Sequence, residues 1–403
     1  MVSTQDILEA RERIGALVSK TPCCRSVTFS ELTGAEVFIK FENLQMTGSF
    51  KERGAANILQ SLSPEQRKRG AVAASAGNHA QGVAYHAGRL GIPATIVMPE
   101  HTPLIKVSRT RNFGARVVLA GATFDEAYAE ARRIQEEQGQ VFVHPFDDPL
   151  VIAGQGTIGL EILEQVPDVE AAVVPIGGGG LISGVAVALK EARPGVRVIG
   201  VQAAAFPSMK ASVDAGSATT VGGGHTIADG IAVKRPGELT LRHVQRYVDG
   251  IVTVTEEEIA YAILALLEKE KTVAEGAGAA ALAALLNGHI EGLRGKKTVV
   301  VLSGGNIDVT LLSRIIERGL VKEGRLVRMV VTVADRPGGL AGLARVVADS
   351  GANVIEIHHD RAFGMAAMGE TDVELTLETR GHDHIQLLRE RLARAGYRVF
   401  EKS

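Results

Sequence analysis

Short apolar runs alternate with helix-like segments through most of residues 1–320, and this alternation restricts the chain to few folds. Apolar runs of about four to eight residues bounded by turn residues are typical of strands buried on both faces, as in a parallel sheet. In 124–138 and 256–267, apolar residues recur every three or four positions, as on the buried face of a helix. The sequence therefore predicts an α/β fold, with helices on both faces of a parallel sheet. The runs that we interpret as strands are 71–75, 94–98, 116–119, 141–143, 171–176, 196–202 and 298–302.

The alternation ends in a charged, glycine-containing segment, 317–325, where we place a domain boundary. The first domain then covers 1–322 and the second covers 326–403. The second domain is expected to run strand, helix, strand, strand, helix, strand, which is the small ferredoxin-like α+β plan. Because such a domain is too small for the main chemistry, we expect it to regulate or to oligomerise. Its expected elements are 326–333, 340–350, 353–358, 371–377, 383–395 and 398–400.

The composition excludes several classes of protein. A chain of 403 residues corresponds to two or three domains at roughly 150 residues each. Lys and Arg (44) nearly balance Asp and Glu (46), so no basic field indicates a nucleic-acid partner. The two cysteines, Cys23 and Cys24, are sequence neighbours, which excludes a disulfide framework and predicts a reducing compartment. Since the N-terminus is charged and has no apolar stretch, we expect a cytoplasmic protein.

The uncharged segment 171–189 has close to the roughly 20 residues that cross a bilayer. Pro175 and the four glycines from Gly177 to Gly180 stand inside it, and they would leave backbone groups unpaired in a lipid-facing helix. A buried strand, a glycine loop and a buried helix explain the same residues. We therefore expect no membrane partner.

Three polar or glycine-rich segments directly follow expected strands: 75–79 (Ser-Ala-Gly-Asn-His), 177–180 (four glycines) and 303–306 (Ser-Gly-Gly-Asn). Because ligands bind at the carboxyl ends of strands in open α/β sheets, these segments should meet at one crevice. The bare N–H groups of the glycines, at a helix N-terminus, suit a phosphate group. No nucleotide-triphosphate motif occurs. The Gly-Ala-Gly-Ala-Ala-Ala run at 276–281 lacks the preceding strand of a dinucleotide site, so we assign it to helix packing.

Taken with these segments, residues 42–55, Glu-Asn-Leu-Gln-Met-Thr-Gly-Ser-Phe-Lys-Glu-Arg-Gly-Ala, resemble the threonine dehydratases, or threonine ammonia-lyases, a family of pyridoxal phosphate enzymes. The order and spacing of the motifs match from about residue 5 to 320. This resemblance implies pyridoxal 5'-phosphate as cofactor and the two-lobed open parallel-sheet fold called fold type II, or tryptophan synthase β-like. The chain from 327 onward looks like an ACT domain, a small amino-acid-binding module. The resemblance is carried by Val-Val-Thr-Val-Ala-Asp-Arg-Pro-Gly-Gly-Leu, which ends at residue 340.

The resemblance gives the covalent chemistry to Lys51. This lysine would form the Schiff base with the cofactor and, once displaced by substrate, would remove the Cα proton as a base. Such a lysine must be neutral to attack, and burial beside a cofactor lowers the pKa of an amine. Taken alone, a lysine beside Glu52 and Arg53 would instead be assigned to a solvated helix face.

By the same resemblance, Phe50 lies against the pyridine ring, Asn78 hydrogen-bonds the ring hydroxyl and Ser303 faces the pyridine nitrogen. A neutral hydroxyl at that nitrogen leaves the carbanion less stabilised than a carboxylate would, which favours prompt loss of the β-hydroxyl over transamination. The substrate carboxylate would be bound by Ser75, Asn78 and His79. The cofactor phosphate would be held by Gly177, Gly178, Gly179, Gly180 and the N–H of Leu181.

Two departures from related enzymes narrow the expected activity. Relatives that racemise serine carry a serine at the position of Ala76, where it is a second acid and base, so dehydration is favoured over racemisation here. The same relatives bind a divalent metal through a glutamate at the position of Gln202, and a neutral amide is a weaker ligand for a hard cation. We therefore predict no divalent metal site and leave a monovalent cation open.

Four further polar features of the sequence each allow a functional and a structural interpretation. Asp229, in Thr-Ile-Ala-Asp-Gly, belongs either to the active site or to a structural turn, and Glu275 either approaches the cofactor or is a helix N-terminal carboxylate. The clusters at 358–360 and 382–384 contain histidines, but we assign them to a strand end and a helix cap rather than to a metal.

The expected activity is β-elimination of L-threonine to 2-oxobutanoate and ammonia, with L-serine giving pyruvate. The alternatives are a fold-related enzyme, either a serine racemase or dehydratase or a β-replacement enzyme, and a non-catalytic amino-acid sensor. The ACT-like domain suggests an amino-acid effector, with isoleucine and valine as the leading candidates. Family precedent favours a homodimer or homotetramer. A biosynthetic role, feeding isoleucine synthesis, and a catabolic role stay open.

Overall fold

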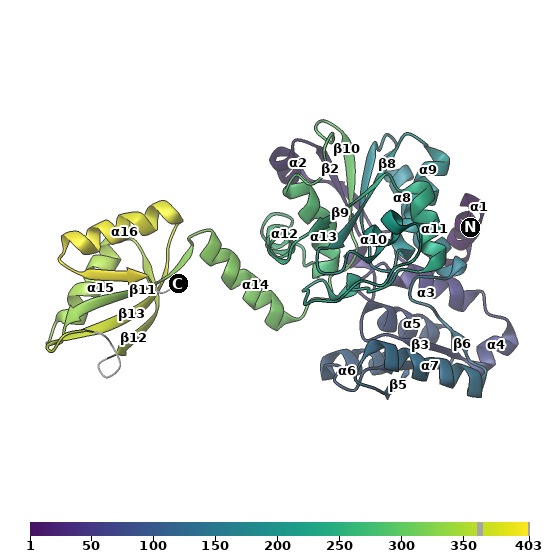
Figure 1. Ribbon diagram of the computed structural model, residues 1–403, viewed down its shortest axis with the longest axis horizontal. Coiled ribbons are helices and arrows are strands. Elements are labelled where there is room, and N and C mark those ends of the chain that lie inside the picture. The colour runs from purple at the N-terminus through teal and green to yellow at the C-terminus, as the bar shows by residue number, and fades with distance from the viewer. Residues whose placement is uncertain (361–365, 402–403) are drawn as a thin grey trace. The chain divides into compact units, whose positions relative to one another are not determined.

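The computed structural model describes residues 1–360 and 366–401, and it divides into two compact units, Met1–Ile307 and Asp308–Ser403 (Figure 1). The first unit contains two separate sheets, and the second contains one. No helix among the described residues is long and apolar enough to span a bilayer. Each unit is considered by itself below.

The larger sheet of the first unit has the strand order β1-β2-β10-β7-β8-β9, and every neighbouring pair is parallel except β1 with β2. The smaller sheet, β5-β4-β3-β6, is entirely parallel. All seven expected strands occur, each within one residue at either end. The strands are β1 Cys23–Arg25, β2 Glu36–Phe41, β3 Ala71–Ala74, β4 Ala94–Met98, β5 Arg116–Leu119, β6 Val141–Phe142, β7 Ala171–Pro175, β8 Arg197–Ala203, β9 Gly250–Val254 and β10 Lys297–Leu302.

Helices cover both faces of both sheets, which confirms the predicted two-lobed α/β fold (Figure 1). The segment 171–189 folds as strand β7, a glycine loop and helix α9, as expected. The helices of this unit, with two short 3-10 turns, are α1 Thr4–Ile14, α2 Val27–Thr33, η1 Glu42–Leu44, α3 Lys51–Gln60, α4 Pro64–Arg69, α5 Asn78–Arg89, α6 Leu104–Asn112, α7 Phe124–Gln138, α8 Pro149–Gln165, α9 Gly180–Ala192, α10 Ser208–Ala215, η2 Asp229–Ile231, α11 Glu238–Tyr247, α12 Glu256–Lys269 and α13 Gly276–Leu286.

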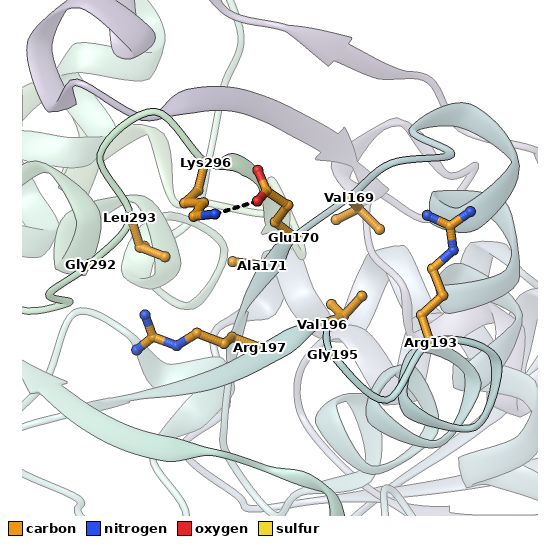
Figure 2. A pocket seen from close by; sticks show the side chains of 10 residues that line it. All are labelled: Val169, Glu170, Ala171, Arg193, Gly195, Val196, Arg197, Gly292, Leu293 and Lys296. Atoms are coloured by element: carbon orange, nitrogen blue, oxygen red, sulfur yellow. Dashed lines mark hydrogen bonds and ion pairs between the residues drawn. The ribbon is translucent and has the colours of Figure 1, made fainter.

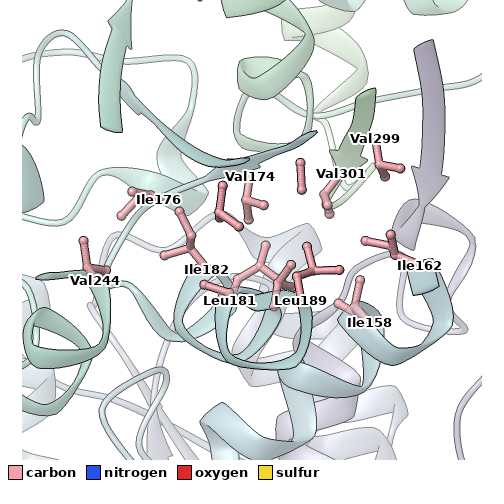
Figure 3. Close-up of a cluster of buried hydrophobic side chains, with 14 of the residues drawn as sticks. Ile158, Ile162, Val174, Ile176, Leu181, Ile182, Leu189, Val244, Val299 and Val301 are labelled. Carbon is pink, nitrogen blue, oxygen red and sulfur yellow. The ribbon is translucent and has the colours of Figure 1, made fainter. Parts of the chain in front are cut away.

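The main core lies between the larger sheet and helices α8, α9 and α11 (Figure 3). Figure 3 shows apolar side chains of β7 and β10 above those of α8 and α9, among them Val174, Val301, Ile158 and Ile182. Each such side chain contributes roughly 1.5 to 3 kcal/mol when it is removed from water. This core fixes the carboxyl ends of β7 and β10, where two of the polar segments begin.

Glycines bring α3, α8 and α9 into close contact. A Cβ atom at Gly154 of α8 would lie 2.7 Å from the carbonyl oxygen of Arg53 in α3, and one at Gly184 of α9 would overlap the backbone of α8. Because no side chain fits there, the three helices pack backbone against backbone. The start of α3, which carries Lys51, is thereby held against the core of the larger lobe.

In the second unit, the four-stranded antiparallel sheet β12-β13-β11-β14 alternates with helices α15 and α16 in the predicted ferredoxin-like order. The core is formed by Leu343, Val347, Leu388 and Leu392 against the sheet. Helix α14, Val309–Lys322, precedes the sheet and belongs to this unit. The other elements are β11 Leu326–Ala334, α15 Gly339–Ser350, β12 Asn353–Asp360, β13 Glu370–Glu378, α16 His382–Arg394 and β14 Arg398–Glu401.

Candidate active site

The segments that follow β3 and β10 come together with the loop that precedes α3. Ser49 forms an isolated β-bridge with Gly304, and the N–H of Phe50 donates to the carbonyl oxygen of Ser303 at 3.0 Å. Asn306 donates from Nδ2 to Oδ1 of Asn78 at 2.8 Å. Residues that are far apart in the sequence thus lie together at the carboxyl ends of strands from both sheets, and two of the three expected segments, 75–79 and 303–306, are in direct contact.

Lys51 is the first residue of α3, and its amine is directed at a carbonyl group rather than at an acid. Its Nζ donates to the carbonyl oxygen of Pro145 at 2.9 Å and lies 5.1 Å from the centre of the Phe50 ring. Burial lowers the pKa of Lys51 to about 8, against an opposing attraction from Glu275. A substantial share of this amine is therefore neutral near physiological pH, and a neutral amine is a nucleophile and a base.

The four-glycine loop joins β7 to α9, and its backbone is close-packed against the segment that contacts Lys51. A Cβ atom at Gly178 would overlap the ring of Phe146, and one at Gly180 would lie 2.9 Å from the carbonyl oxygen of Phe146. Gly179 has φ +98°, a left-handed conformation that side chains disfavour. The loop is therefore one that only glycine can build.

The same loop meets the requirements of a phosphate site. The N–H of Ser183 donates to the carbonyl oxygen of Gly179, so the N–H groups of the first turn of α9 have no acceptor within the helix. Leu181 belongs to that turn, and its side chain is buried in the core, so it can offer only its N–H. Unpaired N–H groups at a helix N-terminus attract an anion through hydrogen bonds and the helix dipole.

Ser75, Asn78 and His79 lie at the end of β3 and the start of α5. The Ser75 hydroxyl accepts from the N–H of Gly77 at 3.2 Å. The His79 ring is buried, and its Nε2 is 2.8 Å from the carbonyl oxygen of Val143, while burial lowers the pKa of His79 to about 3. His79 is therefore neutral and its ring is engaged, so its free contribution to an anion is its backbone N–H in the first turn of α5.

Ser303 follows β10 directly and is buried, and the nearest partner of its hydroxyl is the carbonyl oxygen of Ala277, at a long 3.4 Å. The weak contact leaves this hydroxyl able to rotate toward another partner. Gly278, in the glycine-alanine run, packs against the backbone of Gly304. The run at 276–281 is part of the buried helix α13, which confirms its assignment to helix packing.

A buried ionic network anchors the first turn of α3 behind Lys51. The guanidinium of Arg53, which is fully buried, donates to both oxygens of Glu42 and both oxygens of Glu161 at 2.6 to 2.9 Å. Lys40 donates to Glu161 at 2.5 Å. Although burial alone would raise it, the pKa of Glu42 is held below its usual range by Arg53.

Two parts of the site are absent from the sequence-based interpretation. The first is the segment after β6, where Pro145 contacts Lys51, Phe146 packs on the glycine loop and the His144 ring accepts from the N–H of Asp147 at 2.8 Å. A signal for it existed, because this polar segment also follows an expected strand. The second is the pairing of Asn78 with Glu275, at 2.6 Å from Nδ2 to Oε1.

The residues with two open interpretations now have positions. Glu275 is the N-cap residue of α13, and its buried carboxyl faces Asn78. Asp229 begins η2 and forms an ion pair with Lys106 of α6 at 2.9 Å. No three His, Cys, Asp or Glu side chains within 1–360 and 366–401 gather in the manner of metal ligands.

A cavity of about 310 Å³ lies at the opposite, amino-terminal edge of the larger sheet, and none of the predicted site residues lines it. Figure 2 shows that Arg193, Arg197 and Lys296 border it, with Lys296 paired to Glu170 at 2.6 Å. In open α/β sheets the ligand crevice lies at the carboxyl ends of the strands. We therefore assign the chemistry to the cluster around Lys51 and not to this cavity.

Comparison with known proteins agrees with this geometry. A family model described as "Pyridoxal-phosphate dependent enzyme" matches residues 14–304. The L-threonine ammonia-lyase of Thermotoga maritima is 56% identical over 399 residues, which cover 99% of each chain. Threonine deaminase isoform 2 of Solanum lycopersicum, in its processed form, superposes with a TM-score of 0.74 at 38% identity, over 78% of this chain and 87% of that one. Serine racemase of Dictyostelium discoideum gives a TM-score of 0.73 at 36% identity, over 76% and 99% of the two chains.

The family model covers the residues of the glycine loop, Lys51 and Ser303. The similarity to a threonine ammonia-lyase extends over both units of the chain. The chain belongs to the pyridoxal-phosphate dependent enzymes and, among them, to the threonine ammonia-lyases.

Proposed function

We propose that this enzyme eliminates the β-hydroxyl of L-threonine, giving 2-oxobutanoate and ammonia, and that it converts L-serine to pyruvate in the same way. The observation that carries the proposal is the Lys51 amine, whose pKa is lowered to about 8 in a crevice that also contains a glycine loop for a phosphate. Full-length similarity to a threonine ammonia-lyase supports the choice of substrate.

Pyridoxal phosphate, when bound, supplies an electron sink for the electrons left on Cα after its proton is removed. The residues of the crevice fit this group. Gly177 to Gly180 and the N–H of Leu181 would hold the phosphate through backbone N–H groups at the start of α9. A Cβ at Gly178 or Gly180 would overlap Phe146 and so displace this loop. Phe50 would pack against the ring.

Lys51 would bind the cofactor covalently and would then act as the base. The carbonyl oxygen of Pro145, 2.9 Å from Nζ, gives the amine a fixed acceptor that does not hold it in the charged, protonated form as a carboxylate would. Lys51 would take the Cα proton of the substrate at Nζ and return a proton to the β-hydroxyl, which then departs as water. The overall change conserves atoms, because the water that leaves is consumed again when ammonia is released.

Ser303 and Asn78 would set the direction of the reaction. The Ser303 hydroxyl would face the pyridine nitrogen, and a neutral partner there stabilises negative charge on Cα less than an acid would. Rapid departure of the β-hydroxyl then becomes the favoured outcome. Asn78 would donate to the ring hydroxyl, and the first turn of α5, with Ser75 and His79, would bind the substrate carboxylate.

We propose a catalytic part, 1–322, and an ACT-like regulatory part, 326–403. Helix α14, Val309–Lys322, precedes the regulatory part in the sequence but belongs to the second compact unit. The ferredoxin-like order of its elements supports this assignment. An amino-acid effector, isoleucine or valine, would bind there. We also propose a homodimer or homotetramer, on the precedent of the family. A cytoplasmic location is proposed because both cysteines, Cys23 and Cys24, are free thiols.

The function is tested by measuring 2-oxo acid release from L-threonine, L-serine, D-serine and O-acetylserine by the cofactor-loaded enzyme, with Lys51→Ala as control. Rapid formation of 2-oxobutanoate that is lost in the variant is the expected result. No turnover of threonine or serine would overturn the proposal in favour of β-replacement if O-acetylserine reacts, or of a sensor if nothing does. Formation of D-serine from L-serine would favour racemisation, for which Ala76 lacks the acid and base group.

A further inference from the structure

A chain of side-chain hydrogen bonds crosses the candidate site from the loop before α3 to the start of α13. Asn306 donates from Nδ2 to the carbonyl oxygen of Thr47 at 2.6 Å and to Oδ1 of Asn78 at 2.8 Å. Asn78 then donates from Nδ2 to Oε1 of Glu275 at 2.6 Å. Only the Asn78 member has a role in the proposed function.

The two ends of this chain determine its direction. An amide side chain can exchange its oxygen and nitrogen by a flip, so its orientation must follow from its partners. The carbonyl of Thr47 can only accept, which requires Asn306 to present Nδ2 and therefore makes Asn78 present Oδ1 to it. Glu275 at the other end accepts from Asn78. If the Asn78 amide were flipped, its Nδ2 would face Nδ2 of Asn306, donor against donor. Its Oδ1 would face Oε1 of Glu275, acceptor against acceptor.

The side chain of Glu275 is confined by the backbone that surrounds it. It is about 5% exposed, and its own N–H donates to the carbonyl oxygen of Gly304 at 3.1 Å. A Cβ atom at Gly304 would overlap Oε1 of Glu275, and one at Gly278 would overlap the backbone of Gly304. The glycines of two motifs thus make room for this carboxyl.

We propose that Glu275 is a positioning residue of the catalytic site, which together with Asn306 holds the Asn78 amide in the single orientation that leaves one Nδ2 hydrogen for the ring hydroxyl of the cofactor. This inference rests on the proposed function of Asn78. Asn78 has two hydrogens on Nδ2, of which Glu275 takes one. The remaining one is correctly placed only while both neighbours are present.

The protonation of Glu275 changes the strength of this hold. Burial and the nearby charge of Asp229 in η2 raise the pKa of Glu275 to about 7, while Asn78, Lys106 in α6 and the backbone of Asn306 act in the opposite direction. The carboxylate also raises the pKa of Lys51 in α3. A charged acceptor makes a stronger hydrogen bond than a neutral one, so Asn78 is held more firmly above neutral pH than below it.

The test compares Glu275→Ala, Glu275→Gln, Asn306→Ala and the double alanine variant, with Glu258→Gln as control. Glu258 caps α12 and pairs with His289, away from the chain of amides. Two quantities are measured without any substrate: the dissociation constant of pyridoxal phosphate and the visible absorption band of the bound cofactor as a function of pH. Circular dichroism verifies folding of each variant.

Each single alanine variant should weaken cofactor binding about tenfold or more, the loss expected for a hydrogen bond to a charged group. Both should shift the absorption band, and the double variant should be no weaker than the worse single one, because the chain acts as a unit. Glu275→Gln can still accept through its amide oxygen, so it should bind within about threefold of wild type. It should also lose the pH dependence of the band near neutrality.

Wild-type cofactor affinity and a wild-type spectrum in Glu275→Ala would overturn the inference. So would a double variant in which the losses of affinity of the two single variants multiply. If Glu275→Ala fails to fold, a Glu275→Gln spectrum with the wild-type pH dependence overturns it instead. Failure of the proposed function is seen separately, as a wild-type enzyme that binds cofactor and does not turn over L-threonine. The control Glu258→Gln should match wild type in both quantities.

Discussion

Replacing the buried Arg53 by lysine should destabilise the first unit by roughly 4 kcal/mol, although the positive charge is kept. Arg53 makes six hydrogen bonds, to Glu42, Glu161, Thr157 and the carbonyl oxygen of Ser19. A lysine ammonium has about three donors on one atom, so about three bonds are lost at about 1.5 kcal/mol each or more. The carboxylates that lose a partner stay buried, which is why relaxation recovers little.

The matched control makes the same substitution on the surface. Arg133 of α7 also bridges two glutamates, Glu130 at 2.7 Å and Glu137 at 2.5 Å, but its side chain is 55% exposed. Exposed ion pairs of this kind contribute about 0 to 1 kcal/mol, so Arg133→Lys should stay within about 1 kcal/mol of wild type. The comparison isolates the effect of burial.

The assay is urea unfolding of the two apoenzyme variants and wild type, followed by circular dichroism, with the free energy of unfolding taken from the transition of the first unit. Arg53→Lys should lower the midpoint strongly, while Arg133→Lys should leave it nearly unchanged. A difference between the two variants of less than about 1 kcal/mol would refute the claim that the bidentate geometry of the network stabilises α3.

Three further outcomes follow from the site. Gly178→Ala should weaken pyridoxal phosphate binding about tenfold or more, because the added methyl group overlaps the ring of Phe146, and equilibrium dialysis checks this. The rate at which the apoenzyme recombines with cofactor should rise as the pH passes about 8, where Lys51 loses its proton, and a rise centred near the ordinary lysine value would contradict the lowered pKa. The pKa of Glu275 is raised from its ordinary value of 4.5 to about 7, so its protonated form stabilises the fold fully below pH 4.5. This contribution to the free energy of unfolding is lost as the pH rises through about 7. Thermal unfolding of apoenzyme Glu275→Gln should therefore lack that part of the pH dependence.

The strands could be predicted where apolar runs are continuous, because burial on both faces removes polar residues from them. Strands β1, β2 and β9 were missed. In β2, Lys40 interrupts the apolar pattern, yet it is fully buried, and the partner that makes this possible, Glu161, lies 121 residues away. Strand β9 contains the apolar, β-branched run Ile-Val-Thr-Val and is no shorter than β3 or β5, so its signal was present and was not interpreted.

The loops that form the site could be predicted from the sequence, but the contacts between their side chains could not. Ser75, Gly177 and Ser303 each follow a strand, and the topology rule for open α/β sheets brings such positions together. The orientation of Asn78 depends on Glu275, which is 197 residues away, and no local pattern encodes that pairing. The ring of His79 likewise faces Val143 because of packing between β3 and β6.

The most direct test of the account is to identify the lysine that bonds to pyridoxal phosphate. The holoenzyme is reduced with borohydride, which makes the bond permanent, and is then digested and mapped by mass spectrometry. The cofactor mass should be found on Lys51 alone, at the start of α3. Cofactor on another lysine, or none retained after reduction, would contradict it.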